Sequence, residues 1–220
     1  GKYHLKAGMD YLTLVRMFQR GLQSPVRVTF NNIRLLPQLA GRVGGHIEPD
    51  SLAMLEVLIC DTMPAHYGIT RETFIGMFLP DTYELYWNTS PVAFLDRMKR
   101  EYDNFWTDER DQKANAAGLS RQEVITLASI VYEETKMSDE MPAVAGVYIN
   151  RLNRGMMLQA DPTVKFAVGD FTLKRIWERH LKTESPYNTY LNTGLPPGPI
   201  CMPSKKAIDA VLNYQRHDYI

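Results

Sequence analysis

The chain has 220 residues, of which 45% are hydrophobic and 23% are charged. This length is enough for one large domain or two smaller ones with a real hydrophobic core, and the composition is ordinary for a globular protein. The 25 Lys and Arg residues balance 25 Asp and Glu residues, so the formal net charge is zero. That balance argues against a nucleic-acid-binding protein that relies on a strong overall positive field.

Several further classes of protein are excluded or disfavoured by missing patterns. No stretch approaches the roughly 18 consecutive apolar residues of a transmembrane helix, and no signal peptide is visible. The five histidines are scattered, and no HxxxH, CxxC, P-loop, GxGxxG or GxSxG motif occurs, so we expect neither a metal nor a cofactor. Cys60 and Cys201 allow one disulfide, and their separation in the sequence does not decide whether it forms.

The first 60 residues have the pattern of a small α/β unit. Asp10 is a candidate helix cap, and residues 26–30 alternate apolar and polar side chains as a strand does. The remaining expected elements here are a strand over 3–5, a helix over 35–43, and a helix over 52–60 that Ser51 caps.

The rest of the chain is mostly helical by pattern. Ser120 and Glu123 form a capping box, and Pro142 occupies a favoured first-turn position. The expected helices cover 91–106, 124–135, 142–155, 163–168, 173–181 and 205–212, with loop and strand over 76–87, an exposed helix end and loop over 107–118, and irregular structure over 185–203.

Two glutamates end the apolar helix that the capping box opens. Glu134 follows Val131 by three residues and Ile130 by four, which places it on the buried side. Glu133 lies about 100° further round the helix. A carboxyl group on an apolar face has a raised pKa and can serve as a general acid near neutral pH. The alternative is a helix that simply ends in two solvated acids.

Two later segments carry candidate binding residues. Asp161 before Pro162 is typical of a helix N-cap, and Gln159 is the candidate for a substrate-facing side chain beside it. The proline-rich segment 185–203 holds one rigid shape at low entropic cost. Its tyrosines and Asn188 suit sugar binding, in which sugar rings stack on aromatic rings, whereas a purely structural crossing is the alternative.

Six segments, taken together and in this order, resemble the YceG-like family of endolytic murein transglycosylases. They are residues 78–83, 127–135, 147–152, 158–164, 187–190 and 194–200. The first 60 residues are similar, more weakly, to part of the LysM-like module that precedes the catalytic region in this family.

The resemblance implies an α+β fold in two parts. A small LysM-like α/β module (residues 1–60, partial) precedes a mostly helical lysozyme/transglycosylase-like catalytic domain with a few strands (residues 61–220, truncated at its C-terminal end). The family usually carries further residues there, including a strand and a His-Asn segment.

The resemblance also implies an endolytic peptidoglycan lytic transglycosylase with a role in cell wall biogenesis and glycan strand length control. Such an enzyme cleaves the β-1,4 bond between N-acetylmuramic acid and N-acetylglucosamine and leaves a 1,6-anhydro end. Because the sugar's own 6-hydroxyl replaces water, one glutamic acid can act first as acid and then as base, whereas an ordinary glycosidase needs two carboxylates.

Carried onto this chain, the catalytic residue is Glu134. The family often has Glu-Lys-Glu here, where this chain has Tyr132-Glu133-Glu134, so Glu133 is held in reserve. The candidates for binding the glycan are Gln159, Asp161, Tyr187, Asn188, Thr189 and Tyr190.

The implied partners are peptidoglycan glycan strands and peptidoglycan synthases, without nucleic acid. Both chain ends look cut, and an N-terminal anchor absent from this chain would make the protein single-pass in the bacterial cytoplasmic (inner) membrane, with its catalytic domain on the periplasmic side. Two alternatives are a catalytically silent peptidoglycan-binding scaffold and a two-carboxylate hydrolase, for which Asp161 is the one nominee as second carboxylate.

Overall fold

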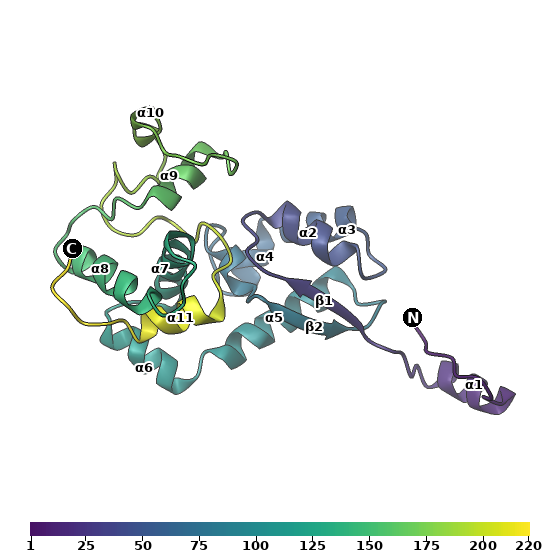
Figure 1. The fold of residues 1–220 in the computed structure, drawn as a ribbon. Helices are drawn as coiled ribbons and strands as arrows, with labels where there is room; N and C mark the ends of the chain where they lie inside the picture. The colour runs from purple at the N-terminus through teal and green to yellow at the C-terminus, as the bar shows by residue number, and fades with distance from the viewer.

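The computed structural model describes residues 1–220, and helices dominate it (Figure 1). Two strands form one small antiparallel sheet between the helices. The fold is therefore mainly α with a minor β component, and the few strands expected after residue 60 are reduced to one.

In chain order the elements are α1 (Tyr11–Gln19), β1 (Val26–Phe30), α2 (Leu36–Gly44), α3 (Ser51–Leu58), α4 (Thr62–His66), the 3₁₀ helix η1 (Phe74–Met77), β2 (Asp81–Leu85), α5 (Pro91–Phe105), α6 (Asp108–Ala116), α7 (Arg121–Glu134), α8 (Met141–Asn153), α9 (Asp161–Val168), α10 (Glu178–Leu181) and α11 (Lys205–Leu212).

The sheet joins two distant parts of the sequence. Strand β1 pairs with β2 in a register that sets Val26 opposite Leu85 and Phe30 opposite Asp81. Alternate residues of β1 are buried, as the period of two predicts. Since β1 precedes residue 60 and β2 follows it, the two parts expected from the sequence share one sheet.

One continuous hydrophobic core also runs through both parts. It contains 43 buried residues, and these extend from Phe30 of β1 through Phe94 of α5 to Leu127 of α7. The Phe30 ring stacks on Tyr83 of β2 at 5.3 Å between centroids. The division of the chain near residue 60 stays a prediction, and the core crosses that point without interruption.

Helix α7 lies at the centre of the helical part, where it packs against α8, α9 and α11. Its capping box is confirmed, because the Ser120 N–H donates to Glu123 Oε2 at 2.8 Å and the Glu123 N–H donates to Ser120 Oγ at 3.3 Å. Helix α1 lies apart from the rest at the end of a linker (Figure 1). The predicted Asp10 cap of α1 is confirmed by the 2.7 Å bond from the Thr13 N–H.

Four local predictions are wrong. Residues 3–5 form no strand, since the only sheet is β1–β2. Asp50 rather than Ser51 caps α3, because its Oδ1 accepts from two N–H groups of the first turn. Residues 108–116 form a separate helix, α6, capped by Thr107 and supported by an ion pair between Glu109 and Lys113 one turn apart. The helix expected over 173–181 shrinks to Glu178–Leu181, because its apolar Trp177 finds no face to pack on and stays 53% exposed.

None of the helices combines the length and the apolar character that crossing a membrane requires. The two cysteines are free thiols, with Cys60 exposed and Cys201 buried.

The shared core predicts that the region around the sheet unfolds with the helices. We expect Phe30→Ala, at a residue only 1% exposed, to lower the free energy of unfolding by about 3–5 kcal/mol, because it leaves a cavity beside Tyr83 and Phe94. Phe18→Ala on α1 is the matched control, since Phe18 is 49% exposed and lies outside the core. Urea unfolding followed by circular dichroism measures both, and equal losses in the two variants would contradict the shared core.

Candidate active site

A groove of about 450 Å³ lies where three segments meet. These are the C-terminal end of α7, the first turns of α9 and the irregular chain before α10. The residues that line it are Glu133, Glu134, Asp161, Pro162, Lys165, Leu173, Lys174, Arg175 and Ile176. The structure thus brings together three of the acidic residues that the sequence singled out, although they come from two segments 27 positions apart at the nearest.

Helix α7 is held in place by the irregular segment that follows α10. The Ser129 side chain, fully buried, accepts from the Ile200 N–H at 3.0 Å and donates to the Thr126 carbonyl at 2.7 Å. Met202, two residues after Ile200, donates its N–H to the Ile33 carbonyl at 2.7 Å. The segment after α10 therefore connects α7, through Ser129, to the β1–α2 connection, through Ile33.

Glu134 is the last residue of α7, and its side chain is accessible from the groove. Loss of surrounding water raises the pKa of its carboxyl, and the nearby Asp161 acts in the same direction. A hydrogen bond from the Tyr148 hydroxyl to Glu134 Oε2, at 3.2 Å, opposes this effect. The position at the negative end of the helix dipole also disfavours a carboxylate. The result is a glutamic acid that holds its proton more tightly than an ordinary one.

The predicted burial of the two glutamates is reversed. The Glu133 side chain is only 12% exposed, whereas Glu134 is open to the groove. The reason is that α7 stops at Glu134, beyond the helices that cover its middle, while Arg34 from the β1–α2 connection covers Glu133. Helical periodicity alone predicts neither the end of α7 at Glu134 nor the contact of Glu133 with Arg34.

Both carboxylate oxygens of Glu133 are occupied by cations. Arg34 Nη2 lies 2.5 Å from one oxygen, and Lys136 Nζ lies 3.3 Å from the other. The Arg34 guanidinium also lies 5.1 Å from the centre of the Phe171 ring. A carboxylate held in this way has a structural role and is poorly placed to give and take a proton.

Asp161 has a different role from the expected one. It is the first residue of α9 rather than its N-cap, which is Ala160, so the N-cap prediction is wrong. Its Oδ1 instead accepts from the Tyr190 hydroxyl at 2.8 Å. Burial, followed by this bond to Asp161, raises the pKa of Tyr190 to about 12, so this phenol remains a donor at neutral pH.

Asn188 and Thr189 lie in the interior, where their polar atoms bind the protein itself. The Asn188 amide donates to the Leu181 and Thr183 carbonyls at 2.9 and 2.8 Å. Thr189 Oγ1 accepts from the Ala160 N–H at 3.0 Å. This geometry favours a positioning role, in which Asn188 ties the loop to the end of α10 and Thr189 ties it to the start of α9.

Gln159 and Tyr187 do not line the groove. Gln159 is exposed and has a left-handed backbone with φ of 51°, and its N–H donates to the Thr189 carbonyl at 3.1 Å. Tyr187 packs on Phe166 at 4.7 Å between ring centroids. Their contact with substrate stays a prediction.

Sequence reasoning missed four residues of this site. Tyr148 is a buried residue of α8, and a buried tyrosine needs a partner for its hydroxyl, which is the one signal for it in the sequence. Lys165, Lys174 and Arg175 line the groove but belong to no recognisable motif, so only the fold reveals them.

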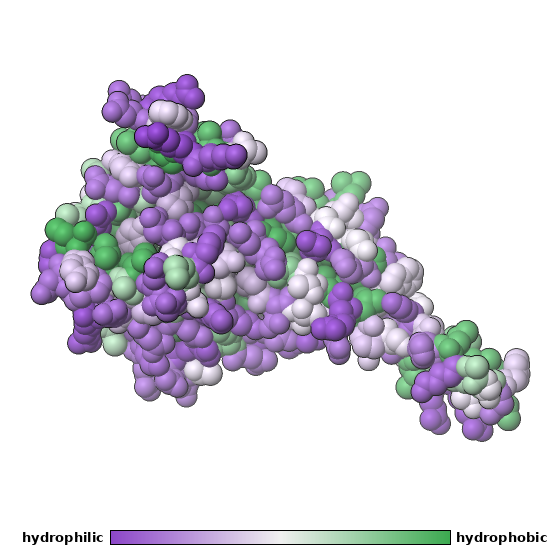
Figure 2. Space-filling model, viewed as in Figure 1, coloured by the Kyte–Doolittle hydropathy of each residue, from purple (hydrophilic) through white to green (hydrophobic).

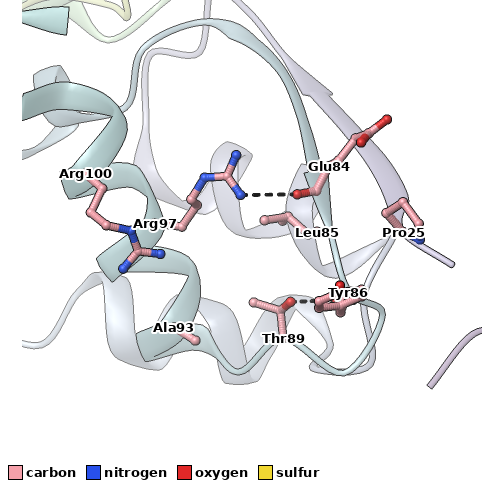
Figure 3. A pocket seen from close by; sticks show the side chains of 8 residues that line it. All are labelled: Pro25, Glu84, Leu85, Tyr86, Thr89, Ala93, Arg97 and Arg100. Carbon is pink, nitrogen blue, oxygen red and sulfur yellow. Dashed lines mark hydrogen bonds between the residues drawn. The ribbon is translucent and has the colours of Figure 1, made fainter. Parts of the chain in front are cut away.

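A second hollow, of about 500 Å³, lies between β2 and α5 (Figure 3). There the Arg97 guanidinium donates to the Glu84 carbonyl at 3.4 Å and to the Glu101 carboxylate at 2.6 Å. Glu84 is the one carboxyl-bearing residue that lines this hollow, whereas Glu133, Glu134 and Asp161 line the groove. No cluster of three potential metal ligands exists anywhere in the chain. The groove at Glu134 is therefore the better candidate for chemistry.

A groove with a partly desolvated glutamic acid on its wall has the form of an acid–base catalytic site. The chain belongs to the YceG-like family, whose model matches residues 1–220, and the resemblance seen in the motifs is confirmed.

Curated relatives carry the name endolytic murein transglycosylase. One from Bacillus subtilis is 27% identical over all of this chain and 65% of its own length. One from Streptococcus pneumoniae is 29% identical over 99% of this chain and 45% of its own length. The chain thus spans about half to two-thirds of these relatives. A crystal structure of a YceG-like protein from Listeria monocytogenes has 26% identity and a TM-score of 0.76, covering 99% of this chain and 76% of that one.

The raised pKa of Glu134 predicts a specific pH dependence of stability. A carboxyl that holds its proton more tightly in the folded state contributes stability below its ordinary pKa of 4.5, and this contribution is lost as pH rises through the folded value. We therefore expect Glu134→Gln to raise the free energy of unfolding at neutral pH and to lose this advantage below about pH 4.

Urea unfolding at a series of pH values measures this effect. The exposed Glu184, replaced by Gln, is the control and should show no comparable pH-dependent gain. A stability change in Glu134→Gln that is the same at every pH would contradict the proposed environment of this carboxyl.

Proposed function

We propose that this protein is an endolytic peptidoglycan lytic transglycosylase with Glu134 as its acid–base residue. The observation that carries the proposal is the Glu134 carboxyl, which lies on the groove wall with a raised pKa in a member of the YceG-like family. The names of the curated relatives support murein as the substrate.

The reaction needs a single group that first gives a proton and then takes one. Protonated Glu134 donates its proton to the glycosidic oxygen as the bond from that oxygen to C1 of N-acetylmuramic acid breaks. The resulting carboxylate then accepts the proton of the 6-hydroxyl of this N-acetylmuramic acid, while the oxygen of the 6-hydroxyl bonds to C1. No water is consumed, and Glu134 ends protonated as it began.

The surroundings of Glu134 suit both halves of this cycle. Desolvation favours the protonated carboxyl that the first step needs, and the Tyr148 hydroxyl stabilises the carboxylate after it. Burial of Tyr148, followed by the proximity of Glu134, raises the pKa of its phenol, so Tyr148 remains a hydrogen-bond donor throughout. A pKa set by two opposing effects is what a group used as acid and then as base requires.

Hydrolysis is the second candidate, because Asp161 lines the same groove and influences the Glu134 carboxyl. A two-carboxylate glycosidase would use Asp161 as nucleophile or as the base for water. The bond from Tyr190 to Asp161 engages one of its oxygens, which favours the single-carboxylate mechanism.

The remaining assignments follow from the substrate. We propose that the protein works where murein lies, on the outer side of the bacterial cytoplasmic membrane, through an anchor outside these residues. Peptidoglycan synthases are the proposed protein partners, since a cutting enzyme that sets strand length must meet strands as they are made.

Replacing the catalytic acid tests the function directly. We expect Glu134→Gln to lower the rate of anhydromuropeptide formation from purified murein by about 10²–10⁴-fold, the usual contribution of a general acid–base group. Product analysis by mass spectrometry measures the rate, in the full-length protein. Glu133→Gln is the matched control and should retain most of the activity, since Glu133 is engaged by Arg34. Equal product from wild type and Glu134→Gln would refute the assignment, and glycan binding without anhydro product from the wild type would favour a silent scaffold.

Labelled water separates the two chemistries. Digestion in H₂¹⁸O should leave the new N-acetylmuramic ends unlabelled, because the 6-hydroxyl of the sugar closes on C1. A reducing end that carries ¹⁸O, and that disappears in Asp161→Asn, would establish hydrolysis instead.

A further inference from the structure

The groove that holds Glu134 is also lined by three cations. Lys165 comes from α9, and Lys174 and Arg175 come from the chain before α10. Not one of them forms an ion pair within the protein. Cations that form no ion pair contribute no ion-pair energy to the fold, so they are free to bind an anion from outside.

Arg175 is held in place by its neighbour. Its guanidinium lies 4.7 Å from the centre of the Trp177 ring, and Trp177 is 53% exposed. Hydrophilic residues cover the projection formed by α9 and α10 (Figure 2). The Trp177 ring attracts the Arg175 guanidinium and so orients it at the rim of the groove. Trp177 is therefore a positioning residue for Arg175.

Glu134 has its own set of neighbours in the groove. Its carboxyl accepts a hydrogen bond from the Tyr148 hydroxyl, and the nearby charge that raises its pKa is that of Asp161. The groove therefore holds both a glutamic acid with a raised pKa and three cations that form no ion pair.

We propose that Lys165, Lys174 and Arg175 bind the free carboxylates of the peptide stems attached to the glycan, so that the groove prefers strands whose stems carry free carboxylates to strands whose stem carboxylates are amidated. This inference rests on the proposed function, which makes murein the substrate. In a stem-bearing strand the sugars are uncharged, because the lactyl carboxyl of N-acetylmuramic acid forms the amide bond to the stem, whereas the stem peptides carry free carboxylates. Charge-assisted bonds to such carboxylates are the interactions that lysine and arginine side chains form best.

The test compares two forms of one substrate. Uncross-linked glycan strands whose stem peptides carry free carboxylates are digested beside the same strands after these carboxylates have been converted to amides. For Lys174→Ala combined with Arg175→Ala, we expect kcat/KM for anhydro product to fall roughly threefold to tenfold on the strands with free carboxylates, and to stay unchanged on the amidated strands. The preference of the wild type should also weaken as salt is raised. Lys182→Ala is the matched control, because Lys182 is exposed near α10 but does not line the groove.

The outcomes are distinguishable. An equal fall on both substrates, or no fall on either, would overturn the proposed role of the cations while leaving the transglycosylase function intact. If the wild type forms no anhydro product from either substrate, the proposed function fails. Binding of the two kinds of strand by isothermal titration calorimetry then decides the present proposal, which stands if the double variant loses affinity for the strands with free stem carboxylates alone.

Discussion

The constraint on which the rest of the structure depends is the burial of α7. Eight consecutive residues of this helix, from Val124 to Val131, are buried, so the helix is covered all round rather than along one stripe. A helix packed on every side cannot rotate or slide without loss of many contacts. Its last turn, and with it Glu133 and Glu134, therefore has one place relative to α8 and α9.

Three segments supply hydrogen bonds or ion pairs to the C-terminal half of α7. The β1–α2 connection supplies Arg34 to Glu133, α8 supplies Tyr148 to Glu134, and the irregular segment after α10 supplies the Ile200 N–H to Ser129. The first 60 residues are thus connected to the candidate site in two ways, through the contact of Arg34 with Glu133 and through the shared sheet. A disturbance of the β1–α2 connection would reach the groove through one side chain, without any contact to substrate.

The local elements could largely be predicted from the sequence, because their signals are local. The capping box at Ser120, the cap at Asp10 and the alternation over Val26–Phe30 each lie within a few residues and appear as expected. The pairing of β1 with β2 and the cover of Glu133 by Arg34 depend on residues that lie 53 and 99 positions apart, and no pattern in one sequence specifies such pairs. That is why the local elements could be predicted while the burial of the two glutamates was reversed.

A chain of zero net charge can still carry a local cluster of cations, and the groove at Glu134 has one. Steering by net charge would act on every anion near the protein, whereas three cations that line one groove act only on a group that reaches them. A cation close to a carboxyl lowers its pKa, and an acidic neighbour raises it. The charged neighbour that acts on Glu134 is Asp161, so the pKa of the Glu134 carboxyl is raised although cations line the same groove.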